Sequence, residues 1–307
     1  MKKLILIDGN SILHRAFHAI PPIHTSTGQI VNAVYGFSST LIGILRLHEP
    51  DYIAVAFDMK GKTFRHEKYE DYKATRVKAP DELYEQIPII KEVVKAFEIP
   101  IFELKGYEAD DLLGTMAVQA ESESDLKTYI FTSDRDAMQL VTEKINVICP
   151  ISGVKKVKIY EPGDVEEKYG LRPDQITDMK ALQGDSSDNI KGIAGIGVKT
   201  ARDLLQKYQT IENIYNHLDE LKPAAKRKME EGRQDAAISK ELATIITDAP
   251  MKLKVRDCAV HEFDADKVRS LFRKLEFSRL LKQFDTLDRN FIARKKIENN
   301  PAQASLF

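Results

Sequence analysis

The chain has 307 residues, of which 43% are apolar and 30% are charged. This composition excludes a disordered protein and suits one large domain or two unequal ones. No apolar run approaches the roughly 20 residues that a membrane-spanning helix requires, and the two cysteines, Cys149 and Cys258, are too few for a disulfide framework or a zinc–cysteine cluster. We therefore expect a cytoplasmic protein with no membrane contact. The 46 basic and 47 acidic residues nearly cancel, which argues against nucleic-acid binding over the whole surface.

Short apolar runs alternate with helical patterns in the first half of the chain. The runs typical of buried strands cover residues 4–7, 52–57, 99–104, 128–132 and 145–149. The helical patterns between them cover residues 31–47, 81–97 and 108–120. This alternation predicts an α/β fold, with a mainly parallel central sheet flanked by helices on both faces. Ser152 and Gly153 predict a hairpin to a further edge strand over residues 154–160.

The second half of the chain loses the strand signal near residues 160–175. Beyond this point, helical patterns cover residues 162–169, 173–182, 198–208, 211–217, 234–247, 266–275 and 277–284. We therefore expect an α/β domain over residues 1–172, an all-helical region over residues 173–287, and a polar, flexible tail over residues 288–307.

Acidic residues follow the predicted strands where those strands end. Asp8 follows the first strand and Asp58 the second, and short turns lead from the third and fourth strands into further acids. These are Glu108, Asp110, Asp111, Asp134 and Asp136. Because the carboxyl ends of parallel strands meet at one edge of the sheet, where open α/β folds bind ligands, we expect the seven carboxylates to lie together. A helix cap explains any single acid equally well, but it does not explain all seven at one edge.

Seven carboxylates in one place repel one another, and protons, arginines or cations must relieve that repulsion. Oxygen ligands without histidine or cysteine are typical of Mg²⁺ or Mn²⁺ rather than Zn²⁺. Because Mg²⁺ keeps several waters and few direct carboxylates, this many acids predicts two or more ions. A haloacid-dehalogenase-like phosphotransferase fits poorly, since Gly9 and Asn10 follow Asp8 where a second acid is needed.

A glycine-rich turn in the helical region follows two further acids, Asp185 and Asp188, which would add to the metal site. The turn reads Gly192-Ile193-Ala194-Gly195-Ile196-Gly197-Val198-Lys199-Thr200-Ala201, and the lack of a preceding apolar strand argues against a P-loop or a Rossmann turn. Its backbone N–H groups and the start of the next helix can bind the phosphates of a DNA backbone. We interpret five of its residues as DNA-binding: Gly192, Gly195, Gly197, Lys199 and Thr200.

Two segments carry a local excess of positive charge. Residues 60–78 contain seven basic and three acidic side chains, and residues 222–233 contain five and two. In the first segment Phe64, Tyr69 and Tyr72 alternate with cations, which suits stacking on bases and neutralising the phosphates of a single strand. A solvated helix has the same composition, but the position after Asp58 favours an exposed insertion over the acidic edge.

These motifs, in order over roughly residues 1–285, resemble the bacterial 5′ nucleases of the flap endonuclease family. In particular they resemble the 5′→3′ exonuclease domain at the N-terminus of bacterial DNA polymerase I. The resemblance is carried by Asp8-Gly9-Asn10, Phe57-Asp58, Tyr72-Lys73-Ala74-Thr75-Arg76, Gly106-Tyr107-Glu108-Ala109-Asp110-Asp111, Thr132-Ser133-Asp134-Arg135-Asp136 and Gly184-Asp185-x-x-Asp188 with the glycine run. It implies a resolvase-like (PIN-like) domain with a helical arch at about residues 60–80, and a helix–hairpin–helix DNA-binding region. It also implies hydrolysis of DNA phosphodiesters at 5′ flaps and nicks during replication and repair.

The same resemblance implies roles for individual residues. All nine acids match metal-site positions, Lys73 and Arg76 match catalytic arch residues near the scissile phosphate, and Tyr72 matches an aromatic that stacks on a flipped nucleotide. The glycine turn matches a motif that binds K⁺ against the DNA backbone. The expected partner is DNA with a 5′ flap, nick or 5′ end, bound by a monomer in the bacterial cytoplasm.

Two further interpretations stay open at this point. The chain end from Gln303 to Phe307 resembles the peptide by which bacterial replication proteins bind the sliding clamp, although a frayed tail fits equally well. The alternative function is a structure-specific DNA-binding or scaffolding protein of the same fold that does not cut, which the intact set of acids disfavours. The sequence is equally compatible with a stand-alone protein and with a fragment of a polymerase.

Overall fold

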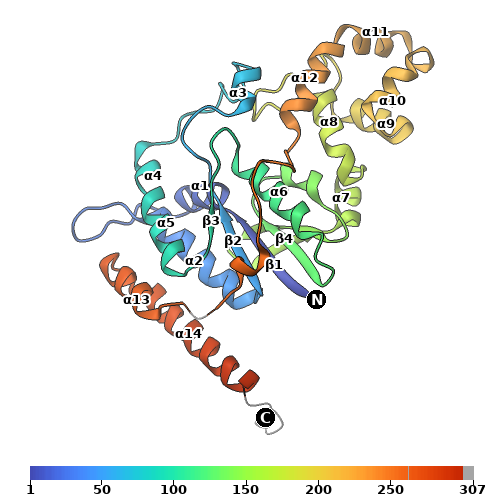
Figure 1. The fold of residues 1–307 in the computed structure, drawn as a ribbon. Helices are drawn as coiled ribbons and strands as arrows, with labels where there is room; N and C mark the ends of the chain where they lie inside the picture. Colours follow the sequence, from blue (N-terminus) through green and yellow to red (C-terminus); the bar gives the residue numbers. More distant parts are fainter. Residues whose placement is uncertain (262, 300–307) are drawn as a thin grey trace.

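Six strands form one sheet in the computed structural model, which describes residues 1–261 and 263–299 (Figure 1). The strands are β1 (Lys2–Asp8), β2 (Tyr52–Ala56), β3 (Ile101–Phe102), β4 (Leu126–Phe131), β5 (Ile145–Ser152) and β6 (Lys156–Tyr160). Their order is β3-β2-β1-β4-β5-β6, with parallel pairing from β3 to β5 and an antiparallel β5–β6 edge. The mainly parallel sheet and its edge hairpin are therefore confirmed. β3 is only two residues long, because the rest of the apolar run 99–104 does not join the ladder.

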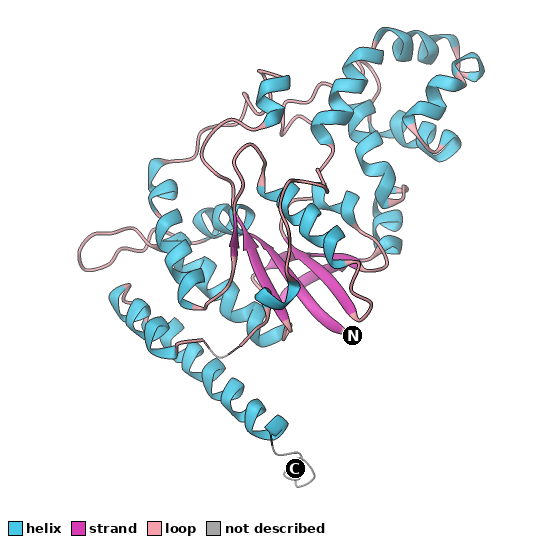
Figure 2. Cartoon of the chain, in the orientation of Figure 1, coloured by secondary structure: helices cyan, strands magenta, loops and turns pink. Residues whose placement is uncertain are grey.

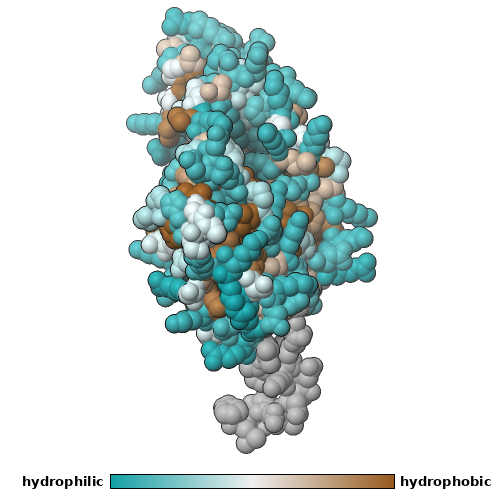
Figure 3. Space-filling view, turned by 90° about the vertical axis from the view of Figure 1, so that its left-hand side faces the viewer, coloured by the Kyte–Doolittle hydropathy of each residue, from teal (hydrophilic) through white to brown (hydrophobic). Residues whose placement is uncertain are grey.

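Helices, joined by loops and turns, make up the rest of the described chain, and the described part farthest from the sheet contains no strand (Figure 2). Before the glycine-rich turn come α1 (Gly9–Ala19), α2 (Asn32–Leu47), α3 (Phe64–Lys68), α4 (Asp81–Glu85), α5 (Ile87–Ala96), α6 (Ala109–Ala120), α7 (Pro162–Tyr169) and α8 (Ile176–Gln183). After it come α9 (Val198–Tyr208), α10 (Ile211–Asn216), α11 (Pro223–Glu231), α12 (Arg233–Ala243), α13 (Ala265–Lys274) and α14 (Ser278–Asn299). Among the described residues, no helix has the length and apolar character needed to cross a bilayer. The face shown in Figure 3 is mainly hydrophilic, with its apolar residues in separate patches.

Successive residues of the central strands face two different cores. Leu4 and Leu6 of β1 face a core that contains α6 and continues into α8, α9 and α10. Ile5 and Ile7 face a second core, which contains α1, α2 and α5. Burial on both faces explains why β1 is an unbroken apolar run rather than an alternating one. Because the first core passes from the sheet into the helical region, α8 is packed firmly beside the carboxyl edge of the sheet.

The last two helices pack on the α/β domain, whereas the sequence suggested a helical region that extended to residue 287. Phe272 of α13 and Phe284 of α14 contact Phe97, which follows α5, in the core that also contains α2. The chain returns to this face beside β2, where the Val260 N–H donates to the Asp51 carbonyl (2.8 Å). In addition, α14 continues to Asn299, so residues 288–299, expected as part of a flexible tail, are helical.

The connection between β2 and α4 is mostly irregular, and we call its residues 59–80 the strap. Of the helical arch expected here, only the five residues of α3 are helical, and turns follow it. The strap extends above the carboxyl edge of the sheet and approaches α12 (Figure 1). There Arg65 Nε donates to the carbonyl of Leu242 (2.9 Å).

Two other local differences have clear physical reasons. The helical pattern over residues 81–97 is interrupted at Gln86, because Pro88 at the start of α5 has no backbone N–H to continue the ladder of the preceding turn. The buried Oε1 of Gln86 accepts the N–H groups of Ala33 and Val34 (2.8 and 3.2 Å). Helix α1, which the sequence analysis did not assign, begins where Asp8 caps the N–H of Ser11 (2.8 Å). The same carboxylate thus ends a strand and starts a helix.

We expect Phe284→Ala to lower the free energy of unfolding by about 3–5 kcal/mol, because it leaves a cavity where a fully buried ring joins α14 to the α/β domain. Equilibrium urea unfolding followed by circular dichroism measures the change. Val118→Ala, at a 40%-exposed position on α6, is the control and should change the free energy by less than about 0.5 kcal/mol. A loss below about 1 kcal/mol for Phe284→Ala would contradict the firm docking of α14.

Candidate active site

A cleft of about 830 Å³ opens at the carboxyl edge of the sheet, beside α6 and α8. Eight of the nine acids expected to bind metal line this cleft. They are Asp8, Asp58, Glu108, Asp110, Asp134, Asp136, Asp185 and Asp188. Four residues of the strap, Arg65, Tyr72, Lys73 and Arg76, line it as well. The structure therefore brings together side chains that are up to 180 positions apart in sequence.

Asp8 lies where β1, β4 and α1 meet. In addition to capping Ser11, its carboxylate accepts a hydrogen bond from Thr132 Oγ1 (2.6 Å) at the end of β4. Burial raises the pKa of Asp8 to about 7, and repulsion from Asp58 and Asp134 adds to a shift that the hydrogen bonds only partly offset. The side chain is 4% exposed, so ionising it is costly unless a cation is near.

Asp58 and Asp110 meet at the first turn of α6. Asp58 Oδ1 accepts the N–H of Ala109 (2.6 Å), which holds the end of β2 against the start of the helix. Burial raises the pKa of Asp58, and burial together with repulsion from Asp8 and Asp134 raises the pKa of Asp110 well above its usual range. Ionising Asp58 and Asp110 together is therefore costly unless a cation is near.

Asp111 differs from the other acids because it does not face the cleft. It is wholly buried (0% exposed), and its two oxygens each accept a hydrogen bond of 2.8 Å from the guanidinium of Arg65. The same oxygens also accept the N–H groups of Glu108 (3.0 Å) and Ile246 (2.9 Å). In this structure Asp111 is an ion-pair partner of Arg65, so it could act as the metal ligand expected from the sequence only if that pair opened.

Arg65 is a structural residue that the sequence analysis did not single out. It is 3% exposed, and besides Asp111 and Leu242 it donates to the carbonyl of Thr244 (2.7 Å). It thereby joins the strap, α6 and the chain that leaves α12. The signal that could have found it is Asp111 itself, since a second acid in the first turn of a mostly apolar helix requires a buried cation when that turn is enclosed.

The sequence analysis also did not identify Lys180 of α8, which bridges two acids of the cleft. Its ammonium group pairs with Asp136 and with Asp185 Oδ2 (2.6 Å). Burial raises the pKa of Asp136 to about 6 although Lys180 opposes the shift. At Asp185 burial is outweighed by hydrogen bonds from Lys180 and Ser187, which lower the pKa to about 2. Lys180 therefore links the α/β domain to the loop before the glycine turn.

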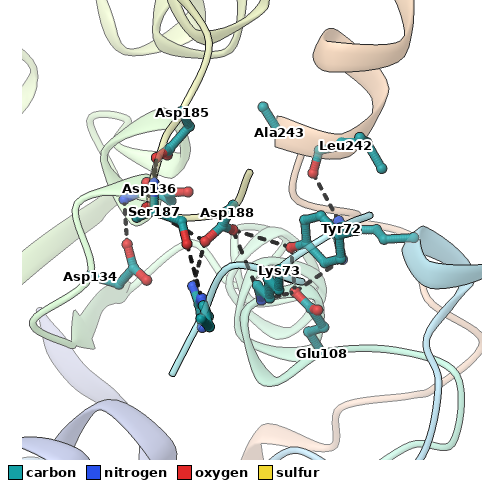
Figure 4. Close-up of polar contacts among 12 residues, drawn as sticks. Tyr72, Lys73, Glu108, Asp134, Asp136, Asp185, Ser187, Asp188, Leu242 and Ala243 are labelled. Carbon is teal, nitrogen blue, oxygen red and sulfur yellow. Dashed lines mark hydrogen bonds and ion pairs between the residues drawn. The ribbon is translucent and has the colours of Figure 1, made fainter. Parts of the chain in front are cut away.

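The strap brings three more polar side chains into the cleft, of which Figure 4 labels Tyr72 and Lys73. The hydroxyl of Tyr72 is 3.2 Å from both Glu108 Oε2 and Asp188 Oδ2. Lys73 Nζ donates to Glu108 Oε2 (2.9 Å), and Arg76 pairs with Asp188. Burial alone would lower the pKa of Lys73, but Glu108 and Asp188 outweigh it and raise the pKa, so the ammonium stays charged. Tyr72 is 3% exposed, so its ring is not presented for stacking as the resemblance implied.

The glycine-rich turn lies between α8 and α9 and borders the loop that carries Asp185 and Asp188. Gly192 has a φ of 63°, and a Cβ there would lie 2.1 Å from the backbone nitrogen of Gly184, so only glycine fits this crossing of the chain. Asp185 and Ile190 exchange two backbone hydrogen bonds (2.7 and 2.8 Å). These bonds hold the two ends of the loop together, which fixes the turn relative to the cleft.

The start of α9 forms the exposed side of this turn. Gly197 precedes the helix, and Lys199 and Thr200 are exposed in its first turn. Lys228 of α11 donates to the carbonyl of Gly195 (2.9 Å), so the second basic segment lies against the turn. Free N–H groups of a helix start beside two lysines can bind a phosphate.

The residues of the cleft fit a hard divalent cation. Carboxylates predominate among the possible ligands, and burial together with repulsion between neighbouring carboxylates raises the pKa values of Asp8, Asp58 and Asp110. Among the residues that the structure describes, no three His, Cys, Asp or Glu side chains already enclose an ion position. Such an open set suits Mg²⁺, which keeps several waters as ligands. His14 and His18 of α1, which the sequence analysis did not place, also line the cleft and stack on each other.

Comparisons with known sequences agree with this geometry. A family model described as the N-terminal resolvase-like domain of 5′-3′ exonucleases matches residues 3–170, and one described as the C-terminal SAM fold of 5′-3′ exonucleases matches residues 171–266. A relative named 5′-3′ exonuclease, from Aquifex aeolicus (strain VF5), is 38% identical over 100% of both chains. DNA polymerase I of Bacillus caldotenax is 44% identical over 93% of this chain, which spans only 32% of that relative.

Solved structures share the fold. T5 5′-exonuclease, solved with bound zinc ions, has a TM-score of 0.67 at 18% identity and covers 95% of this chain and 99% of its own. The catalytic core of Rad2 in complex with a DNA substrate has a TM-score of 0.61 at 15% identity, over 95% of this chain and 92% of its own. With both family models matched in order and a full-length relative at 38% identity, this chain belongs to the 5′-3′ exonuclease family.

Proposed function

We propose that this chain is a structure-specific 5′ nuclease that acts as a 5′→3′ exonuclease and flap endonuclease on DNA. The observation that carries the proposal is the gathering of eight carboxylates in one cleft, next to the cations Lys73 and Arg76 of the strap. Phosphodiester hydrolysis needs positive charge at the phosphate and a deprotonated water, and an acidic cleft that collects divalent ions serves both needs. Membership of the 5′-3′ exonuclease family supports the same chemistry.

Two or more Mg²⁺ or Mn²⁺ ions are the cofactors that we propose. Asp8, Asp58, Asp110 and Asp134 are the first candidates to hold an ion, because the lysines and arginines of the cleft pair with the other acids. Those other acids are Glu108, Asp136, Asp185 and Asp188. When bound, such ions lower the pKa of a water and neutralise charge on the phosphate. The solved structures of T5 exonuclease with metal ions support this assignment.

Lys73 and Arg76 are the side chains that we propose to act on the phosphate directly. Both enter the cleft from the strap, and fixed positive charges there stabilise the negative charge that builds on the phosphoryl oxygens. Tyr72 is enclosed in this arrangement, so we assign it a stacking role only when the strap has moved away from Glu108 and Asp188.

The glycine-rich turn is the proposed grip on the DNA backbone. Gly192, Gly195 and Gly197 shape the turn, and Lys199 and Thr200 at the exposed helix start would contact phosphates. A K⁺ ion at the turn would use backbone carbonyls such as that of Gly195, which now accepts Lys228. The solved complexes of T5 D15 flap endonuclease with DNA and of human GEN1 with a Holliday junction support DNA as the partner.

Three expectations stay predictions: the monomeric state, the cytoplasmic location and the clamp-binding peptide. The peptide, from Gln303 to Phe307, lies outside the described residues.

We expect the chain to release the 5′ strand from a labelled flap in Mg²⁺ and to bind but not cut it in EDTA. Asp134→Asn should reduce turnover by about 100-fold or more, because it removes a charge from the metal site, while flap affinity in EDTA is retained. Gel analysis of products and fluorescence anisotropy measure the two quantities. Asp125→Asn is the matched control, since Asp125 precedes the same strand β4 at its opposite, exposed end.

Two outcomes would contradict the proposal. Tight flap binding without cleavage by the wild-type chain in Mg²⁺ would favour the non-cutting scaffold. Cleavage by Asp134→Asn at the rate of Asp125→Asn would remove Asp134 from the site.

We expect Lys199→Gln to weaken binding of the flap duplex uniformly across sequences and to reduce the slope of log Kd against log salt concentration by about 0.9, the value for one lost phosphate contact. Anisotropy titrations at several salt concentrations measure this slope. Lys207→Gln, at the other end of the same helix and paired with Glu220 (3.1 Å), should leave it unchanged. Equal slopes for both variants would show that the start of α9 does not contact DNA.

A further inference from the structure

One half of the strap is docked on the loop that carries Asp185 and Asp188 and on the end of α12. Tyr72 packs in a small apolar cluster with Ile190, Leu242 and Ala243, and Tyr69 lies against the same cluster. This cluster is separate from the two large cores of the sheet. Its small size means that docking here is held by few apolar contacts, so polar contacts must contribute much of the remaining stability.

Backbone and side-chain hydrogen bonds complete the docking. The N–H of Lys73 donates to the carbonyl of Asp188 (3.0 Å), and Asn189 Nδ2 donates to the carbonyl of Asp71 (2.7 Å). Lys73 adopts a left-handed φ of 57° to reach this position, which is unfavourable for a residue with a side chain. The docked conformation therefore persists only while its contacts persist.

The ionic contacts of the docked half use two acids of the proposed metal site. Glu108 Oε2 accepts from Lys73, and Asp188 pairs with Arg76. The Tyr72 hydroxyl, which has one proton to donate, lies 3.2 Å from an oxygen of each acid. A divalent ion that takes an oxygen of Glu108 or Asp188 removes an acceptor from these groups. It also repels the charges of Lys73 and Arg76 at short range. An ion at these acids and a docked strap are therefore mutually antagonistic.

The base of the strap is anchored in a different way. Arg65 is bound by Asp111, which lies outside the cleft, and by the carbonyls of Leu242 and Thr244, and it makes a longer contact of 3.4 Å with Glu108 Oε2. An ion that takes Glu108 leaves the two bonds to Asp111 and the two carbonyl bonds in place. Movement is thus confined to the part of the strap that follows α3.

We propose that residues 69–76 form a latch that divalent cations release. Without ions, Tyr72, Lys73 and Arg76 supply the hydrogen bonds and positive charge that Glu108 and Asp188 require. When ions bind, these side chains lose their partners, the latch undocks, and Lys73, Arg76 and the ring of Tyr72 become available to a nucleic-acid strand. This inference rests on the proposed metal site but concerns the free protein, before any DNA is bound.

Hydrogen–deuterium exchange of the peptide over residues 69–76 tests the latch without DNA and without an activity readout. We expect exchange at least about tenfold faster in saturating Mg²⁺ than in EDTA at equal ionic strength, because the Lys73 N–H loses the Asp188 carbonyl. Peptides from β1 should be unaffected. Calorimetry on the same samples reports whether Mg²⁺ binds.

Tyr72→Phe is the decisive variant, and Tyr69→Phe is its matched control. Tyr72→Phe keeps the ring in the apolar cluster and removes the contacts to Glu108 and Asp188, so the Mg²⁺ concentration at half-release should fall by about fivefold or more. The hydroxyl of Tyr69 is buried without a hydrogen-bond partner, so Tyr69→Phe should not lower the midpoint. Asn189→Gly, which removes the bond to Asp71 and tolerates the φ of 57° at this position, should act in the same direction as Tyr72→Phe.

The outcomes separate the latch from the proposed function. Mg²⁺ binding with unchanged or slower exchange of residues 69–76 would overturn the latch, even if flap cleavage depends on Mg²⁺. Equal midpoints for Tyr72→Phe and Tyr69→Phe would also overturn it. Release by Mg²⁺ in a chain that cuts no flap would support the latch and contradict the nuclease assignment.

Discussion

Repulsion among carboxylates is the constraint on which the cleft depends. Parallel strands deliver Asp8, Asp58 and Asp134 to one edge of the sheet, and five more acids come from the short helix after β4, the start of α6 and the loop after α8. Burial makes each negative charge costly, and the resulting pKa shifts run upward at Asp8, Asp58, Asp110 and Asp136. A cluster of this kind is stable only when positive charge enters it, from the chain, from protons or from metal ions.

Side chains of the protein supply positive charge at three places, which differ in how firmly the cation is held. Arg65 neutralises Asp111 in a fully enclosed ion pair that also ties α6 to the end of α12. Lys180 spans Asp136 and Asp185 and so connects the sheet edge to the loop before the glycine turn. Lys73 and Arg76 lie on the irregular strap, where they can leave again. Lys73 and Arg76 on the strap are therefore easier to displace than Arg65 and Lys180, and they pair with acids for which ions would compete. The same cleft can thus exist both with and without metal.

The sheet and the acidic cluster could be predicted from the sequence because both follow from backbone rules. An apolar run such as residues 4–7 must be buried on both faces, and the residues after parallel strands must share an edge. Side-chain partnerships could not be predicted in this way. Arg65 is one of seven basic residues in its segment, and the sequence does not show that it turns inward to Asp111. Nor does the helical pattern around Phe272 and Phe284 show which core these rings enter.

The central claim is that the cleft carboxylates bind divalent cations, and anomalous diffraction from crystals soaked in Mn²⁺ tests it most directly. We expect anomalous peaks within coordination distance of the cleft carboxylates, first of all Asp8, Asp58, Asp110 and Asp134, with none at Asp111. Peaks confined to the protein surface, or a strong peak at Asp111 with Arg65 displaced, would contradict this claim.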